Sequence, residues 1–145
     1  MTSSTSPVGR ASFAPVRLRR HADYQRAYAA SRKRQSASMS WFLAPQQAEA
    51  LPEHLRPTGP RVGLTAGKVI GKAHERNRIK RRMREALRRH LELLPNGFDL
   101  ILHPRRQVLS IDFAKLEAEV VRILEQARAE AYRATSAQPR PTPAP

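Results

Sequence analysis

Apolar side chains recur at helical spacing in three stretches of the chain. Within residues 21–31, Tyr24, Ala27 and Tyr28 fall on one face, because residues three and four apart are neighbours on a helix. The second stretch, residues 74–94, carries a narrow stripe formed by Ile79, Met83, Leu87, Leu91 and Leu94. The third stretch, from Asp112 as N-cap to about Tyr132, carries a stripe formed by Phe113, Leu116, Val120, Ile123, Leu124 and Ala127. The pattern predicts three amphipathic helices.

Shorter stretches are rich in alternating or clustered apolar residues and predict strands. They are residues 39–44 (MSWFLA), 61–66 (RVGLTA) and 98–103 (FDLILH), with residues 68–70 as a short additional strand. Residues 45–60 contain four prolines and are predicted to form a loop. Helices and strands in this order predict an α/β (α+β) fold, in which helices pack on a small mixed sheet.

The two ends of the chain lack this patterning. Residues 1–16 are polar and irregular, and residues 134–145 are rich in Pro and Ala, so both segments are predicted to be disordered. The remaining residues, 17–133, are numerous enough to bury a core and are predicted to form one domain of the 145-residue chain.

The chain is strongly basic, with a net charge of +15 and a pI of about 11.6. Such a charge predicts attraction to polyanions, with nucleic acid as the leading partner class and an anionic membrane surface as the competing one. No apolar run is long enough to span a bilayer, and the stripe on residues 74–94 lacks Trp or Phe, which disfavours a membrane partner. The N-terminus shows no secretion signal and the chain has no cysteine, so a cytoplasmic location is expected.

Much of the positive charge lies on residues 71–90, where nine Lys and Arg residues face only Glu75 and Glu85. A solvated helix face, the ordinary explanation of a charge run, usually interleaves acids with bases, and this one does not. Arg is also preferred over Lys here, and its planar fork matches two phosphate oxygens at once. The charge distribution therefore favours binding to nucleic acid over a merely solvated surface.

No catalytic side chain and no protein-held metal site are predicted. The five histidines form no H-x-x-x-H pair, and the carboxylates form no cluster suited to two-metal hydrolysis. Residues 67–72 (GKVIGK) resemble a phosphate loop, but the spacing of the glycines is one residue too short, and Ala73 stands where Ser or Thr is required.

Four segments resemble one known family. Residues 76–81 (RNRIKR), preceded by 68–73 (KVIGKA), resemble the RNR signature of the bacterial ribonuclease P protein subunit. Residues 17–28 (RLRRHADYQRAY) are similar to the family's opening segment, 61–64 (RVGL) to its second strand and 98–101 (FDLI) to its last strand. The resemblance covers about residues 17–130, and the order and spacing of the segments make it specific.

The resemblance implies a two-layer αβββαβα sandwich of three helices and a mixed four-stranded sheet. That fold is similar to the second domain of ribosomal protein S5 and has a left-handed β-α-β crossover. The implied partners are the catalytic RNA of ribonuclease P and precursor tRNA, without a membrane or a small-molecule substrate. The implied function is to promote endonucleolytic removal of the 5′ leader by an RNA that itself holds the catalytic Mg²⁺.

The resemblance also implies two sets of binding residues. The RNA-binding set is Lys68, Lys72, Arg76, Asn77, Arg78, Lys80, Arg81, Arg82, Arg84 and Arg88. The leader-binding set is Arg17, Arg19, Tyr24, Tyr28 and Phe42. Aromatic rings beside basic side chains are typical of single-stranded RNA sites, although aromatic residues at helical spacing are also typical of an ordinary core. A structural RNA-binding protein of ribosomal type, with no associated reaction, is the alternative function.

Overall fold

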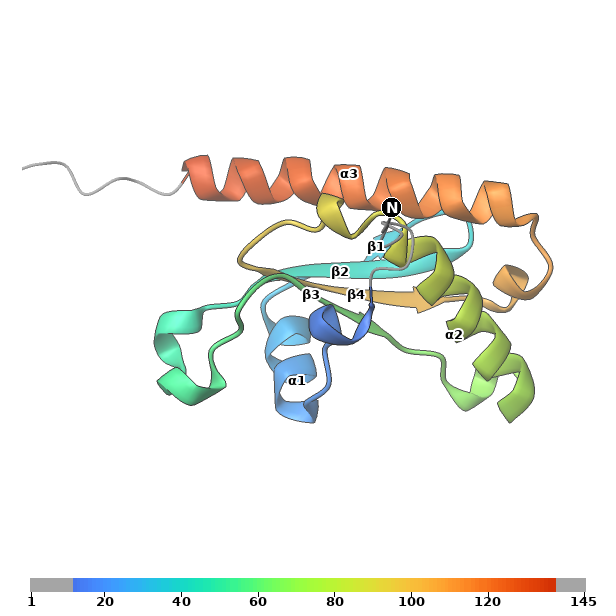
Figure 1. The fold of residues 1–145 in the computed structure, drawn as a ribbon, viewed down its shortest axis with the longest axis horizontal. Helices are drawn as coiled ribbons and strands as arrows, with labels where there is room; N and C mark the ends of the chain where they lie inside the picture. The colour runs from blue at the N-terminus through green and yellow to red at the C-terminus, as the bar shows by residue number, and fades with distance from the viewer. Residues whose placement is uncertain (1–11, 138–145) are drawn as a thin grey trace, which may run out of the picture.

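The structure, a computed structural model, describes residues 12–137. Its three helices are α1 (His21–Ala29), α2 (Ala73–Arg88) and α3 (Phe113–Ala137), and its four strands are β1 (Arg34–Gln35), β2 (Met39–Pro45), β3 (Arg61–Leu64) and β4 (Phe98–Pro104). Short 3-10 turns join these elements. The long helix α3 lies above the sheet and the short helix α1 lies below it (Figure 1).

The four strands form one mixed sheet in the order β1-β2-β4-β3. Strand β2 pairs antiparallel with both β1 and β4, whereas β3 and β4 are parallel and are joined through α2. A parallel pair requires such a crossover connection because its two strands run the same way. The predicted fold class of helices on a small mixed sheet is confirmed.

The larger core lies between the sheet and the helices α2 and α3. Alternate strand residues point into it, including Trp41, Val62 and Leu102, because successive side chains of a strand face opposite sides. The helices contribute the residues predicted from their apolar stripes, and Met83 and Leu124 are among those that are fully buried. The alternating apolar residues of the strands and the apolar stripes of the helices therefore pack together in this one core.

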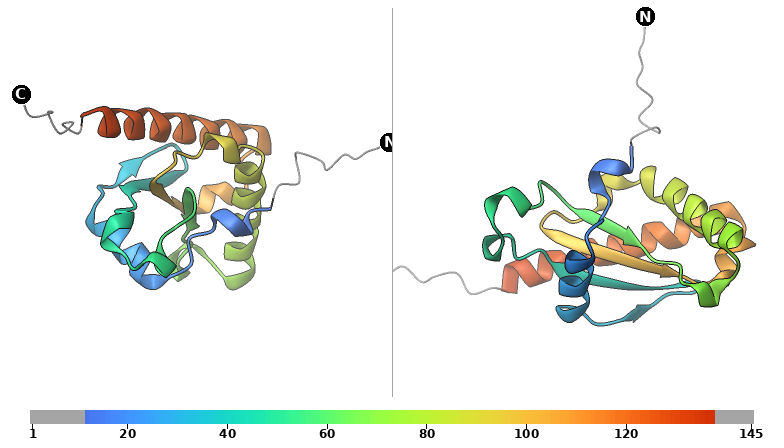
Figure 2. Two further views of the ribbon diagram at one scale, coloured as in Figure 1. Left: turned by 60° about the vertical axis from the view of Figure 1, so that its left-hand side comes forward. Right: turned by 90° about the horizontal axis from the view of Figure 1, so that it is seen from below.

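A smaller core lies on the opposite face, under α1. Leu18, Ala27, Ala44 and Ile101 are buried there, and three aromatic side chains pack around them partly exposed. In the view from below, α1 lies in front of the sheet and α3 behind it (Figure 2). Because α1 has only nine residues, it covers this face incompletely, and the expected two-layer sandwich gains a partial third layer.

Several predicted boundaries differ from the structure. Residues 68–70 form a 3-10 turn rather than a strand, since Gly67 and Gly71 flank them and Val69 is 97% exposed, with no core to pack against. The strand that completes the sheet is β1 instead. The helix predicted over 74–94 ends at Arg88, and a 3-10 turn at Leu91–Leu93 follows it.

The predicted ends of the domain also shift. Phe13 and Val16 pack against the larger core, around a 3-10 turn at Ala14–Val16. Helix α3 continues to Ala137, past the boundary predicted at residue 133. The rest of the two segments predicted to be disordered, residues 1–11 and 138–145, lies outside the described residues. Among residues 12–137, no helix combines the length and the apolar character that crossing a bilayer would need.

Candidate RNA-binding surfaces

The start of α2 is held in place by a surface ion pair. The Glu75 carboxylate accepts a hydrogen bond from the Lys72 backbone N–H at 2.9 Å, which satisfies one free donor of the helix N-terminus. Arg106 donates to Glu75 Oε2 at 2.6 Å and to the Ile70 carbonyl at 3.0 Å. The Arg106 guanidinium, followed by the Lys72 N–H, lowers the pKa of Glu75 to about 2. Glu75 is thus ionised, and both oxygens of its carboxylate are bound within the protein rather than free to meet a ligand.

The turn before α2 depends on a glycine at position 71. A Cβ atom built there would lie 2.5 Å from both Arg106 Nη1 and Glu75 Oε1, so a side chain would displace the ion pair. The Gly71 carbonyl also accepts a hydrogen bond of 2.7 Å from Arg76 Nη1. Arg76, the first residue of the RNR signature, therefore helps to shape the turn.

Most of the predicted RNA-binding side chains on and before α2 point into solvent. Lys68, Lys72, Asn77, Arg78 and Arg81 are exposed, while Lys80 and Arg84 are half-buried. Among residues 12–137, the side chains of Asn77, Arg78, Arg81 and Arg84 make no hydrogen bond or ion pair. An Arg side chain without an acidic partner keeps all its donors available for phosphate oxygens.

Besides Arg76, two predicted RNA-binding arginines are used inside the protein. Arg82 donates to the backbone carbonyls of Leu109, at 2.9 Å, and Ile111, and so joins α2 to the turn before α3. Arg88 makes a two-pronged ion pair with Glu85 at 2.8 and 2.7 Å. Arg82 borders the buried stripe and meets free carbonyls there, which the count of charges along the sequence could not show.

Aromatic rings gather on the sheet face that α1 partly covers. Tyr28 contacts Phe42 edge to face, with ring centroids 5.0 Å apart, and Tyr24 lies 6.3 Å from Tyr28 one helical turn earlier. His103 completes the group, with its ring centroid 5.1 Å from that of Phe42. These four residues are called the aromatic cleft below, after the role predicted for three of them. All four are only partly buried, so their rings border both the small core and solvent.

Tyr24 lies directly over the backbone of β3. A Cβ atom at Gly63 would come within 2.5 Å of the Tyr24 hydroxyl, so the glycine creates the space for the ring. The hydroxyl donates to the Leu18 carbonyl at 3.3 Å. Burial and then the neighbouring Tyr28 raise the pKa of Tyr24, against the opposing charge of Arg17.

His103 was not predicted as a site residue, yet it binds the Tyr28 hydroxyl through Nε2 at 2.7 Å. Burial, followed by the positive charge of Lys33, lowers the pKa of His103, which favours the neutral imidazole. The signal in the sequence was the strand alternation, which places His103 on the same face as Ile101 and, through antiparallel pairing, beside the strand that carries Phe42.

The predicted basic residues of the cleft come from the segment before α1. Arg17 and Arg19 are both exposed, and the backbone of Arg17 forms a bridge to Val62 of β3. The Leu18 N–H donates to the Val62 carbonyl at 2.9 Å, which anchors this segment beside the sheet. The charge of Arg17 acts on the Tyr24 hydroxyl, so Arg17 lies near this aromatic ring. Arg19 makes no side-chain hydrogen bond or ion pair within residues 12–137, and its place in the leader site stays a prediction.

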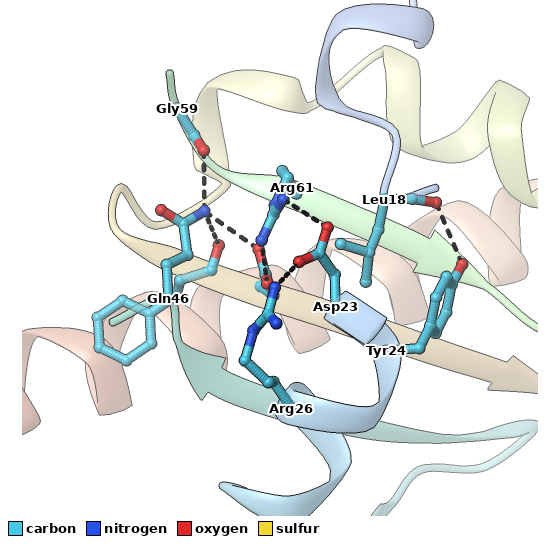
Figure 3. Close-up of polar contacts among 9 residues, drawn as sticks. Leu18, Asp23, Tyr24, Arg26, Gln46, Gly59 and Arg61 are labelled. Atoms are coloured by element: carbon cyan, nitrogen blue, oxygen red, sulfur yellow. Dashed lines mark hydrogen bonds and ion pairs between the residues drawn. The ribbon is translucent and has the colours of Figure 1, made fainter. Parts of the chain in front are cut away.

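An ion-pair network attaches α1 to the sheet (Figure 3). Arg61 binds both oxygens of Asp99, at 2.9 and 2.8 Å, and reaches Asp23 of α1 at 3.1 Å. Arg26 pairs with the second oxygen of Asp23, and Gln46 donates to Asp99 at 3.1 Å. Asp23 lies in the first turn of α1, where a negative charge complements the helix dipole, and it is also a buried partner of Arg61.

The acidic residues near both surfaces are occupied by arginines. Asp23 and Asp99 bind Arg61, Glu75 binds Arg106, and Glu85 binds Arg88 and Arg89. Over residues 12–137, no group of three or more His, Asp or Glu side chains is arranged to hold a metal ion. Mg²⁺ prefers free carboxylates and water, and these paired carboxylates do not fit it.

Sequence comparison identifies relatives over most of the chain. A family model described as Ribonuclease P matches residues 14–128. The ribonuclease P protein component of Chloroflexus aggregans is 37% identical over 112 residues, covering 77% of this chain and 76% of the relative. That of Thermobifida fusca is 34% identical over 106 residues, covering 72% of this chain and 70% of the relative.

Solved structures show the same fold. The RNase P protein from Thermotoga maritima matches with a TM-score of 0.62 at 23% identity, over 76% of this chain and 96% of that one. The Staphylococcus aureus RNase P protein matches with a TM-score of 0.61 at 21% identity, over 78% of this chain and 95% of that one. The chain therefore belongs to the ribonuclease P protein component family, the protein subunits of a ribonucleoprotein endoribonuclease that act together with an RNA subunit.

Proposed function

We propose that the chain binds the RNA subunit of ribonuclease P through α2 and holds the 5′ leader of precursor tRNA in the aromatic cleft. The observation that carries this proposal is the separation of two chemically distinct surfaces on one sheet. Unpaired cationic side chains lie on α2, and partly exposed aromatic rings lie on the sheet face that α1 partly covers. Family membership disfavours the alternative of a structural RNA-binding protein with no associated reaction.

The α2 surface suits a structured RNA backbone. Arg78 and Arg81 are exposed and extend from a helix that is fixed to the sheet by buried Ile79 and Met83. Phosphate contacts of this kind position a protein without reading sequence, and they add binding free energy by releasing condensed counterions. A rigid, arginine-rich helix therefore serves a permanent RNA partner.

The aromatic cleft suits a single strand. Bases that are not paired can stack on exposed aromatic rings, which contributes about 1–3 kcal/mol per base and tolerates any sequence. Tyr24, Tyr28 and Phe42 offer such rings, and Arg17, whose charge acts on Tyr24, would meet the phosphates together with the exposed Arg19 two residues further on. Tolerance of sequence is what a leader site needs, because one enzyme processes many precursors.

In this proposal the RNA holds the Mg²⁺ that supports hydrolysis. The acidic side chains near the two surfaces are ion-paired, as described above, so the chain's own contribution is positional and electrostatic. Cationic side chains on α2 reduce phosphate repulsion within the RNA, and cleft contacts hold the substrate. The protein should consequently matter most when Mg²⁺ is scarce.

Cleavage of precursor tRNA by a bacterial ribonuclease P RNA at low Mg²⁺, with and without the protein, tests this function. We expect stimulation by the wild type, and Tyr28→Ala should weaken binding of precursor tRNA while leaving mature tRNA unaffected. Tyr132→Ala is the matched control, since Tyr132 is an exposed tyrosine on α3, away from the cleft. A lack of stimulation, or an equal loss for mature tRNA, would contradict the assignment.

A further inference from the structure

We propose that single-stranded RNA leaving the aromatic cleft continues around strand β1 into a groove beside the C-terminal turns of α3, where 5′-distal leader nucleotides bind. This inference rests on the proposed function, because it extends the leader site. The groove, called the α3 groove below, has a volume of about 530 Å³ and is lined by Arg32, Arg34, Leu43, Phe98, Glu130 and Arg133, among others.

Residues 32–34 connect the two sites. They follow α1 and lead into β1, which forms one edge of the sheet, so they pass from the face of the cleft to the face of α3. Lys33 stands near enough to His103 for its charge to act on the imidazole of the cleft. Arg32 and Arg34, on either side of it, line the α3 groove. Three consecutive cations thus span the distance between cleft and groove.

The wall of the groove on α3 is organised by one ion pair. Arg34 pairs with Glu130 and also lies over the Trp41 ring, 5.4 Å from its centroid. Glu130, the only acidic residue that lines the groove among residues 12–137, is therefore neutralised. Arg32 and Arg133 are exposed, and neither makes a side-chain hydrogen bond or ion pair within residues 12–137.

Charge and surface chemistry select the occupant. The groove is cationic because three arginines and one glutamate line it. Leu43 and Phe98 form an apolar part of the lining. Single-stranded RNA presents both matching features, since its phosphates are anionic and its unpaired bases have apolar faces. Continuity with the cleft identifies this strand as the leader rather than a separate RNA.

One wall of the α3 groove lies beyond the part of the chain that the family model matches. The family match ends at residue 128, whereas Glu130 and Arg133 belong to the turns of α3 that follow it. These turns lie toward the same end of the sheet as α1, on the opposite face (Figure 1). A relative with a shorter last helix would lack one wall of the groove.

The test measures affinity against leader length in the holoenzyme assembled from the full chain and a bacterial ribonuclease P RNA. Precursor tRNAs carry leaders lengthened one nucleotide at a time. We expect Arg133→Glu to reduce affinity about tenfold, the size of one lost charge-assisted contact, only for leaders long enough to leave the cleft. Arg32→Glu should give the same dependence on leader length.

Arg128→Glu is the matched control. Arg128 lies on the same helix with the same charge, but it lines a different groove together with Tyr132. Equal losses in Arg128→Glu and Arg133→Glu, or losses independent of leader length, would overturn the proposal in favour of diffuse attraction. If Tyr28→Ala weakens leader binding but Arg133→Glu does not, only the α3 groove fails; if neither does, the proposed function fails as well.

Discussion

At the scale of single residues, the aromatic cleft depends on the absence of a side chain at Gly63. The Tyr24 ring occupies the position that a Cβ atom would take, at 2.5 Å from its hydroxyl. Interiors are packed too closely to absorb such an overlap without movement of a side chain or of the backbone. The geometry of the cleft is therefore set partly by a strand residue that contacts no RNA in the proposal.

Gly63→Ala should displace the Tyr24 ring. We expect a loss of about 1–3 kcal/mol in the free energy of unfolding, typical of overpacking, together with weaker binding of leader-containing substrates. Chemical denaturation and precursor-tRNA binding measure the two effects. Gly59→Ala is the control, because no atom lies within 4 Å of a Cβ built there. Unchanged stability and binding in Gly63→Ala would show that the ring moves aside freely.

His103 should make stability depend on pH. Burial and then Lys33 lower its pKa in the folded protein, so below the ordinary value of about 6.5 the unfolded chain binds the proton more readily. The contribution to stability is therefore complete above that value and is lost as the pH falls. His103→Gln should show a smaller decrease in the free energy of unfolding between about pH 7 and 5. Identical decreases in both proteins would remove His103 as the cause.

At the scale of elements, the placement of α1 rests on Arg61. The helix has only nine residues and buries little apolar surface, whereas Asp23 and Asp99 are each 4% exposed and share this one guanidinium. Buried carboxylates are costly without a partner. The helix that carries Tyr24 and Tyr28 is consequently positioned by charge as much as by packing.

Arg61→Ala should destabilise the fold by about 3–5 kcal/mol, because it leaves two buried carboxylates without their shared partner. Arg26→Ala removes only the more exposed partner of Asp23 and should cost about 0–1 kcal/mol. Urea denaturation of both variants measures the difference. Equal, small losses would mean that water replaces Arg61 at the carboxylates.

The elements that sequence reasoning identified are those with strong periodic patterns. The apolar spacing located α1, α2 and α3, whereas the role of the aromatic residues of α1 came from the family resemblance and stays a prediction. Strand β1 was not predicted, because its two residues, Arg34 and Gln35, are too few to show an alternating pattern. The contact of His103 and the ion pairs of Arg61 were not predicted either. They join residues from separate elements, and a single sequence does not reveal which strands are neighbours.

At the scale of the whole molecule, the arginines fall into two groups: those that bind other groups of the protein and those that are exposed to solvent. Arg61, Arg82 and Arg106 bind groups of the protein itself, while Arg78 and Arg81 are exposed. The 27 Lys and Arg residues of the sequence therefore overstate the number of cations available to RNA.

This division predicts different effects on the salt dependence of RNA binding. Arg78→Gln combined with Arg81→Gln should weaken binding and reduce the slope of log K against log salt by about 1 for each lost phosphate contact. Arg82→Gln should lower the free energy of unfolding and leave that slope unchanged. Titration at several salt concentrations separates the two classes, and equal slopes for all variants would contradict the division.

The two edge strands of the sheet, β1 and β3, also affect whether copies of the protein associate with one another in the absence of RNA. β1 offers an incoming strand only two residues to pair with, and on the opposite border Arg17 and Leu18 already cover part of β3. Long uncovered border strands are templates for aggregation, and shortening or covering them removes the template. Together with like-charge repulsion between copies, this construction disfavours edge-to-edge association of the protein in the absence of RNA.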